Sequence, residues 1–353
     1  MFSSRAKRPI LGVDITVSGV KLVELAQSGE SYRVEAYASE PIPADSMDDA
    51  DIVDVEAVAQ AVRRALKRSG TRSREAAAAI AGEAVVTRMT RIPGRLSDDE
   101  MQAHAAFQAE QFLPFPMEEA NLDFEVAGPS EVAPGMLDVL LVAARSVHVS
   151  QRQRALRAGG LEARVVEPEA HALERACRLL THQMIGGGLR QMIALVEFGA
   201  VTTTFSALSD RKLVYTRNFA FGGQQLTDEV MQRYGLNPAE AERAKQAGDL
   251  PEDYATDLLA GFREDMARQV SRSLQFFLAS QNDAGQPVQV LVGGGCARLP
   301  GVAAAVEERL GIPAQIVDPL GHLGVGEKAG AQGVRGGDTA LMTACGLALR
   351  NFD

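Results

Sequence analysis

The chain has 353 residues, of which 46% are hydrophobic, 23% charged and 5% aromatic, and its formal net charge is −10. The length is too great for one small core, the composition excludes a disordered chain, and the acidic balance disfavours nucleic acid as the main partner. Three widely spaced cysteines predict a reducing compartment without a disulfide framework, and the spacing of the five histidines predicts no structural metal site.

Two features of the sequence bear on localisation. No apolar run approaches the roughly 18 residues of a membrane-spanning helix. The basic stretch 1–9 is not followed by a secretory apolar region, because "ILGVDI" is short and contains Asp14. We therefore expect a cytoplasmic protein whose contact with a membrane comes through a partner.

The first predicted elements are the strands within 10–37. The stretch "ILGVDITVSGVKLVEL" alternates as a buried strand, a tight turn and a second strand, with Asp14 entering the turn and Lys21 leaving it. A carboxylate and an ammonium group beside the backbone N–H groups of a turn suit a phosphate site. Asp14 alone is equally compatible with a simple turn former.

The next part of the chain predicts an acidic loop, a helix and a buried strand. The loop covers 38–54, the helix ends at Gly70, and the strand returns through "EAAAAIAGEAVVTRMTRI". A helix with a capping box, two strands and a second helix follow. Together they predict a small inserted subdomain, about 84–162.

The opening pattern returns in the second half of the chain. The stretch "ALVEFGAVTTTFSAL" aligns with "LGVDITVSGVKLVEL" at an offset of 183, which places Glu197 opposite Asp14 and Gly199 opposite Thr16. An internal duplication predicts two related halves that face each other, although short strand–turn–strand matches also occur by chance.

The rest of the sequence predicts several helices between 227 and 280. A strand, a glycine turn and a helix then follow in "PVQVLVGGGCARLPGVAAAVEERLG". The glycine-rich stretch 321–338 lacks apolar periodicity and predicts a mobile loop, and a small-residue helix closes the chain. The two turns and the glycines at 293–295 predict a nucleotide in a cleft between two α/β halves, although such glycines also serve as tight connections. The spacings of a P-loop, a dinucleotide fold, a nucleophile elbow and an HExxH zinc site are absent from the sequence.

In combination these motifs resemble the actin-like ATPase superfamily and, within it, the PilM family of type IV pilus assembly proteins, which is related to the cell-division protein FtsA. The stretches "LPFPMEEANLDFEV", "FGGQQLTDEV" and "ACGLALRNF" are similar to what PilM proteins carry at these points. The resemblance implies a two-domain actin-like α/β fold, made of duplicated ribonuclease-H-like halves, with an FtsA-like inserted subdomain. The expected division is 1–83 with 163–190 and 340–353 for the first domain, 84–162 for the inserted subdomain, 191–220 with 287–339 for the second domain, and 221–286 for its insertion.

The resemblance also assigns roles around bound ATP and Mg²⁺. Asp14 would hold Mg²⁺ through water, Lys21 would reach the phosphates, and Glu197 would orient Mg²⁺ or the attacking water as the candidate catalytic residue. The remaining expected nucleotide contacts are Thr16, Val17, Ser18, Gly199 and Thr203 at the phosphates, Glu242 and Lys245 at the ribose, and Gly293, Gly294 and Gly295 at the adenine.

Two residues depart from the family pattern. Thr16 replaces a glycine, and its β-branched side chain resists positive φ. Glu197 replaces an aspartate and is longer by about 1.5 Å, which displaces any water that it orients. We therefore expect nucleotide binding with slow or no hydrolysis.

The implied activity is assembly of the pilus platform at the inner face of the inner membrane. The expected partner is the N-terminal cytoplasmic segment of PilN and, through it, PilO, PilP and the pilus motor ATPases. The segment would lie in a groove between the first domain and its insertion, where Phe112, Phe115 and Phe124 are candidate lining residues if they are not core residues. The alternatives are an active ATPase or small-molecule kinase of the same fold, and an FtsA-like filament-forming protein that self-associates.

Overall fold

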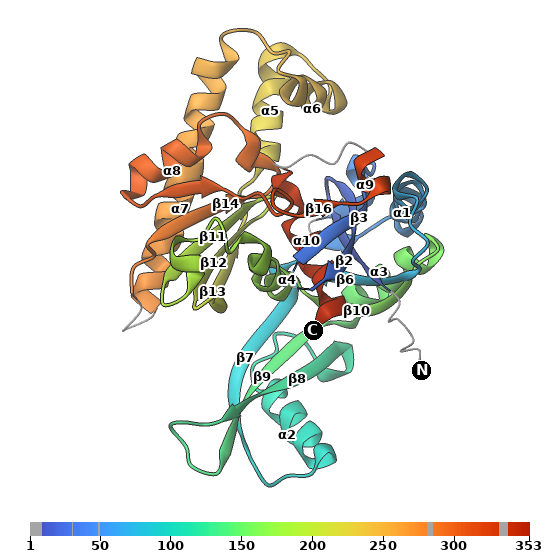
Figure 1. Cartoon of the computed structure of the whole chain (residues 1–353), viewed down its shortest axis with the longest axis vertical. Coiled ribbons are helices and arrows are strands. Elements are labelled where there is room, and N and C mark those ends of the chain that lie inside the picture. The colour runs from blue at the N-terminus through green and yellow to red at the C-terminus, as the bar shows by residue number, and fades with distance from the viewer. Residues whose placement is uncertain (1–8, 30, 49, 281–284, 332–337) are drawn as a thin grey trace.

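The computed structural model describes residues 9–29, 31–48, 50–280, 285–331 and 338–353. Its body consists of two mixed β-sheets with helices between and outside them (Figure 1). The first sheet has the strand order β10-β6-β1-β2-β3-β16, and the second has the order β13-β12-β11-β14-β15. The strands of the first sheet are β1 (Ile10–Thr16), β2 (Gly19–Ser28), β3 (Ser31–Glu40), β6 (Glu75–Ile80), β10 (Glu162–Pro168) and β16 (Gly324–Val325). Those of the second are β11 (Met192–Phe198), β12 (Thr203–Ser209), β13 (Lys212–Phe219), β14 (Gln289–Gly293) and β15 (Ala314–Ile316).

The two sheets repeat one topology. Three consecutive antiparallel strands, β1-β2-β3, correspond to β11-β12-β13, and the parallel strands β6 and β10 correspond to β14 and β15. The predicted duplication is therefore confirmed at the level of strand order and direction.

Helices cover both faces of each sheet. The outer helices of the first sheet are α1 (Val55–Ser69) and α3 (Ser146–Ala158), those of the second are α7 (Ala260–Ser280) and α8 (Val302–Leu310), and α4 (Glu169–Ala176) and α10 (Met342–Leu349) lie in the middle. Side chains of α4 and α10 pack against both sheets, so the two halves share a central helical layer (Figure 1). All eight residues of α10 are buried, which explains its small-residue sequence.

The inserted subdomain is a three-stranded sheet with a helix on one face. It contains β7 (Val85–Pro93), α2 (Asp98–Glu110), β8 (Ala120–Pro129) and β9 (Met136–Arg145), in the strand order β7-β9-β8. The prediction of a single strand for "EAAAAIAGEAVVTRMTRI" is wrong, because the 3₁₀ turn Gly82–Ala84 divides this stretch into two strands, β6 and β7. The helix α3 packs mainly on α1 and β10, so we propose that the inserted subdomain ends at Arg145 rather than at 162.

The insertion in the second half contains α5 (Gly223–Tyr234), α6 (Pro238–Ala247), a π-helical turn (Ala255–Leu259) and α7. Because α7 contributes Phe262, Met266, Val270 and Phe277 to the core of the second sheet, part of this insertion is a layer of the domain itself.

The glycine-rich stretch differs from the predicted loop. Within it, β16 pairs with β3 and is followed by α9 (Glu327–Ala331), while residues 332–337 lie outside the described residues. Among the helices that the structure describes, none is long and apolar enough to span a bilayer.

Candidate functional site

The hairpin of β1 and β2 brings Asp14 and Lys21 directly opposite each other. Lys21 Nζ donates a hydrogen bond to Asp14 Oδ2 at 3.1 Å, and only 14% and 8% of the two side chains is exposed. Burial lowers the pKa of Lys21, but the carboxylate of Asp14 raises it more, so the net pKa is above its ordinary value. The hairpin therefore presents a permanently charged ammonium group beside the turn.

Thr16 is accommodated without strain. It ends β1 opposite Gly19, and the described non-glycine residues with positive φ are Arg190, Asp210 and Arg211. The Thr16 hydroxyl lies 2.9 Å from that of Ser18 across the two-residue turn, which also contains Val17. The glycine that this turn requires is Gly19, where a Cβ atom would lie 2.4 Å from Glu40 O.

Glu197 occupies the corresponding place in the second half and faces Thr204 on β12 and Gly293 on β14. A Cβ atom at Gly293 would lie 1.8 Å from Glu197 Oε1, so the glycine makes room for this longer acid. Glu197 Oε1 is buried and has no hydrogen-bond partner among the described residues. Burial, followed by the negative charges of Glu169 and Asp14, raises the pKa of Glu197 well above its usual range.

Glu169, the first residue of α4, is the site residue that the sequence reasoning missed. Thr204 Oγ1 and Thr343 Oγ1 each donate a weak hydrogen bond to it at 3.4 Å. Burial and then the charge of Asp14 raise the pKa of Glu169 to about 7, against a smaller opposing effect of Lys21. The only local signal is an acid after Pro168 at a strand-to-helix junction, a position that favours a carboxylate.

Three acids, Asp14, Glu169 and Glu197, thus lie within electrostatic reach of the Lys21 ammonium group, and burial together with neighbouring acids disfavours the charged forms of Glu169 and Glu197. Such a site favours a cation. Within the described residues, no group of three or more His, Cys, Asp or Glu side chains is arranged to hold a metal ion directly. Mg²⁺ would fit here through water and phosphate oxygens, as it commonly does.

The glycine turn after β14 is attached to the first half of the molecule. Thr339 Oγ1 donates to Gly294 O at 2.7 Å, and Gly294 N donates to Thr339 O at 3.0 Å. The adjacent Asp338 accepts a hydrogen bond from Tyr37 of β3 at 2.9 Å. Gly294 has φ +83°, and a Cβ atom there would lie 2.2 Å from Phe198 O, so this turn requires glycine. Its neighbour Gly295 begins a 3₁₀ turn with open space beside it.

Two of the predicted phosphate contacts are engaged in the structure itself. The Thr203 hydroxyl is buried and donates to Phe221 O at 2.7 Å. Gly199 O accepts hydrogen bonds from Gly223 N at 3.0 Å and from the Cys296 thiol at 3.3 Å. These hydrogen bonds support the turn and engage the Thr203 hydroxyl hydrogen within the protein.

Glu242 and Lys245 come together on α6. Lys245 Nζ lies 2.8 Å from Glu242 Oε2 and donates to Thr227 Oγ1 of α5 at 2.6 Å. Burial raises the pKa of Glu242. The hydrogen bond and the charge of Lys245 together lower it by more, so the net pKa is below its ordinary value. Both charges act on the thiol of Cys296, which places the pair within electrostatic reach of the glycine turn.

A separate groove lies between the inserted sheet and the first sheet. It has a volume of about 250 Å³ and is lined by 163–168 of β10, Asn121–Asp123 of β8, Val142 and Ala144 of β9, Val149 and Gln153 of α3, and Ile80 and Val85.

The three predicted phenylalanines are not among the residues that line this groove. Phe112 and Phe124 pack on the core of the inserted subdomain, and the Arg88 guanidinium lies 5.0 Å from the Phe112 ring centroid. Phe115 lies under the Arg145 guanidinium, with Cζ 4.8 Å from its ring centroid. Phe112 also lines a second pocket of about 510 Å³ on the inserted subdomain.

Comparisons with known proteins agree with this architecture. The sequence model of the family described as "Type IV pilus assembly protein PilM" matches residues 12–352. The solved "PilM-PilN type IV pilus biogenesis complex" contains a chain that is 26% identical, with a TM-score of 0.81 over 98% of this chain and 99% of that one. The ethanolamine utilization protein EutJ from Carboxydothermus hydrogenoformans is 17% identical, with a TM-score of 0.54 over 96% of this chain and 89% of that one. These neighbours confirm the two-domain actin-like fold.

Proposed function

The chain belongs to the PilM family of type IV pilus assembly proteins, and from this premise we propose that it is an actin-like adaptor that binds the N-terminal cytoplasmic segment of PilN. Through PilN it would join PilO, PilP and the pilus motor ATPases at the inner face of the inner membrane. The observation that carries the proposal is the groove beside the inserted subdomain, together with the likeness to a chain solved in complex with PilN.

The groove suits an extended peptide. It runs between β10, the outer strand of the first sheet, and β8, the outer strand of the inserted sheet, so a bound segment can add to a sheet edge through main-chain hydrogen bonds. Leu122, Val142 and Val165 line it with apolar surface, while Asp123 and Arg164 add charge. Apolar surface supplies affinity, and the polar groups supply register.

Replacing Val142 with Asp is expected to weaken binding of a synthetic PilN N-terminal peptide by about thirtyfold or more, because it puts a charge into the apolar part of the groove (~2 kcal/mol or more). The matched control is Val214→Asp on β13, where the side chain is already 46% exposed. Isothermal titration of the folded variants measures the effect. Equal binding by both variants would place the peptide elsewhere.

We propose that the site around Lys21, Glu169 and Glu197, between the two halves, binds ATP with Mg²⁺. Lys21 would contact phosphate oxygens, with the backbone of Thr16, Val17 and Ser18 on the same turn, while Asp14 would hold the water shell of the ion. Gly293, Gly294 and Gly295 would lie along the adenine, and Glu242 and Lys245 would contact the ribose. Bound Mg²⁺ supplies positive charge that neutralises the phosphates.

The state of the acids supports slow hydrolysis at most. Burial and neighbouring acids raise the pKa of Glu197 well above its usual range, so the charged, proton-accepting form of this side chain is disfavoured. Glu169, with a pKa of about 7, is the better proton acceptor, and this observation keeps a weak ATPase as the second candidate function.

A direct contact links the flank of the groove to the second half of the molecule. The 3₁₀ turn Gly82–Ala84 packs on β13 of the second sheet, and a Cβ atom at Gly82 would lie 1.6 Å from Asn218 Nδ2. Ile80 and Val85 flank this turn and line the groove. A movement of the second half on nucleotide binding would therefore reach the groove, and we propose that nucleotide and peptide affinities are coupled, which must be reciprocal.

A further inference from the structure

Basic side chains gather at one end of the first sheet. Lys67, Arg72, Arg74 and Arg157 are exposed, and no ion pair within the described part of the chain involves any of them. We name these four residues the basic end. They stand out because the chain as a whole has a net charge of −10.

Hydrogen bonds and packing show that the segments carrying these residues converge. Arg63 Nη1, one helical turn before Lys67 on α1, donates to Ala158 O at the end of α3 at 2.7 Å. Glu162 N at the start of β10 donates to Arg74 O at 2.7 Å. Gly160, which follows α3, is close to Leu66 of α1: a Cβ atom at Gly160 would lie 3.9 Å from Leu66 Cδ1. The four cations therefore lie around one corner of the molecule.

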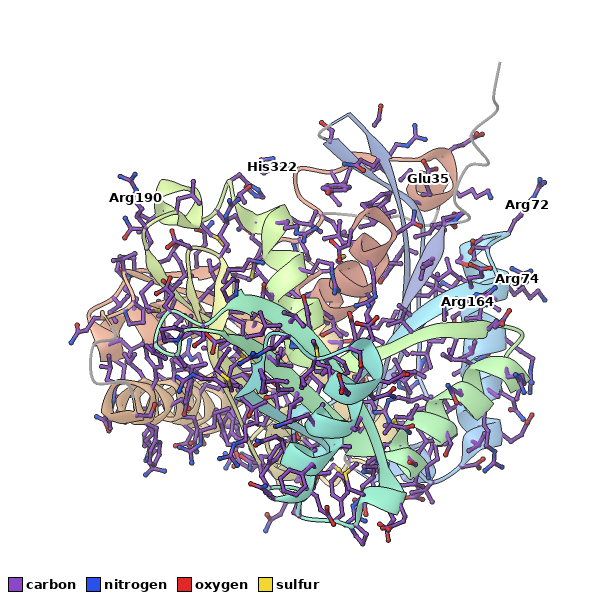
Figure 2. The ribbon with its side chains drawn as sticks, turned by 90° about the horizontal axis from the view of Figure 1, so that it is seen from below. Glu35, Arg72, Arg74, Arg164, Arg190 and His322 are labelled. Carbon is purple, nitrogen blue, oxygen red and sulfur yellow. The ribbon has the colours of Figure 1, made fainter. Side chains whose placement is uncertain are left out.

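The groove for the partner segment begins at the same corner. Arg164 lines the groove, and Figure 2 shows it on the same side of the molecule as Arg72 and Arg74, far from Arg190. Arg164 itself is balanced by Glu75 at 2.9 Å and Glu162 at 3.2 Å, so the unpaired charge at this corner belongs to the basic end.

We propose that the basic end contacts an anionic phospholipid surface when the groove holds the membrane-attached partner; the inference rests on the proposed function. Charge complementarity carries the argument, because each Lys or Arg near an anionic leaflet contributes about 1 kcal/mol and the attraction fades within a Debye length of about 8 Å. Four such residues are too few for strong binding alone. Next to a tethered segment they fix the orientation of the adaptor, since the tether supplies a high local concentration.

Vesicles that carry the PilN N-terminal peptide on a lipid anchor at its carboxyl end test the proposal. The full chain is titrated on phosphatidylcholine vesicles and on vesicles of phosphatidylcholine with phosphatidylglycerol at 3:2. Binding is expected to be at least about tenfold tighter on the anionic vesicles, and high salt should remove the difference. Equal affinity for both vesicles would overturn the proposal.

Charge reversal separates lipid contact from other effects. Arg72→Glu with Arg74→Glu is expected to abolish the preference for anionic vesicles. Arg190→Glu with Arg309→Glu has the same change in net charge at exposed positions elsewhere, Arg309 being on α8 across the molecule from α1 (Figure 1), and should preserve the preference. Loss in both double variants would show a net-charge effect only and would contradict the proposal.

Titration of the soluble peptide into the same proteins completes the test. Wild type and both double variants are expected to bind it equally. If the Arg72/Arg74 variant alone loses soluble peptide, the basic end binds the peptide and not lipid, which overturns the inference. If wild type itself fails to bind soluble peptide, the proposed function fails instead.

Discussion

Glu169→Gln is expected to raise the free energy of unfolding of the nucleotide-free protein at pH 8 by about 3 kcal/mol. The pKa of Glu169 is about 7 in the folded chain against 4.5 for a free side chain, and each pKa unit corresponds to about 1.4 kcal/mol. The folded state binds more protons than the unfolded state between these values, so the carboxylate costs stability as pH rises from 4.5 to 7. The amide removes this cost and keeps one oxygen, which can accept from one of the two hydroxyls, Thr204 or Thr343, that donate to different oxygens of the carboxylate.

Urea unfolding at pH 5.5 and pH 8 measures the effect. The gain should be larger at pH 8, because the carboxylate of the wild type is then fully charged. The matched control is Glu308→Gln on the exposed side of α8. Its free energy of unfolding should stay within about 0.5 kcal/mol of wild type at both pH values. A loss of stability in Glu169→Gln at both pH values would show that the folded chain prefers a charged Glu169.

The same variant is expected to bind Mg²⁺-ATP less tightly, by about tenfold or more, since it removes negative charge that favours the cation. Higher stability together with weaker ligand binding is the pattern of a site whose buried charges serve function. A nucleotide titration with and without Mg²⁺ measures it. Unchanged Mg²⁺ dependence would separate Glu169 from the ligand site.

Gly346→Ala is expected to destabilise the protein by about 3 kcal/mol or more. Gly346 lies where α10 crosses α4, and a Cβ atom there would be 1.8 Å from Ala172 O and 2.5 Å from Ala172 C. The obstacle is backbone, which cannot rotate away as a side chain can, so the two central helices would have to separate.

Gly261→Ala is the control for this substitution. Gly261 is exposed on α7 with nothing within 4 Å of its ideal Cβ position, so alanine should stabilise the helix by about 0.5–1 kcal/mol. Thermal or urea unfolding measures the change in the free energy of unfolding, which should be negative for Gly346→Ala and positive for Gly261→Ala. A neutral Gly346→Ala would contradict the close crossing of α10 and α4.

The sequence predicts those parts of the fold that local patterns encode. Alternating apolar residues and tight turns reveal both hairpins, and the shared pattern around Asp14 and Glu197 reveals the duplication. Glu242 and Lys245, which the resemblance alone assigns to the ribose, pair with each other at i,i+3 spacing on α6.

Other features depend on contacts that no local pattern encodes. The raised pKa and the hydrogen bonds of Glu169 depend on side chains of β1, β12 and α10 that only the folded chain brings near it. The glycines at 324 and 326 continue a sheet because they reach the edge of β3, which their composition does not reveal. Phe112 and Phe124 pack on the core of the small inserted sheet beside other apolar side chains such as Met101 and Leu137, and no local pattern distinguishes this role from lining a groove.

The most direct test of the adaptor account is calorimetric titration of the full chain with a synthetic PilN N-terminal peptide, in matched runs with and without Mg²⁺-ATP. The account predicts saturable binding at one site per chain and an affinity that differs between the two runs. Absence of peptide binding in both runs, by protein that unfolds cooperatively and is therefore native, would contradict it.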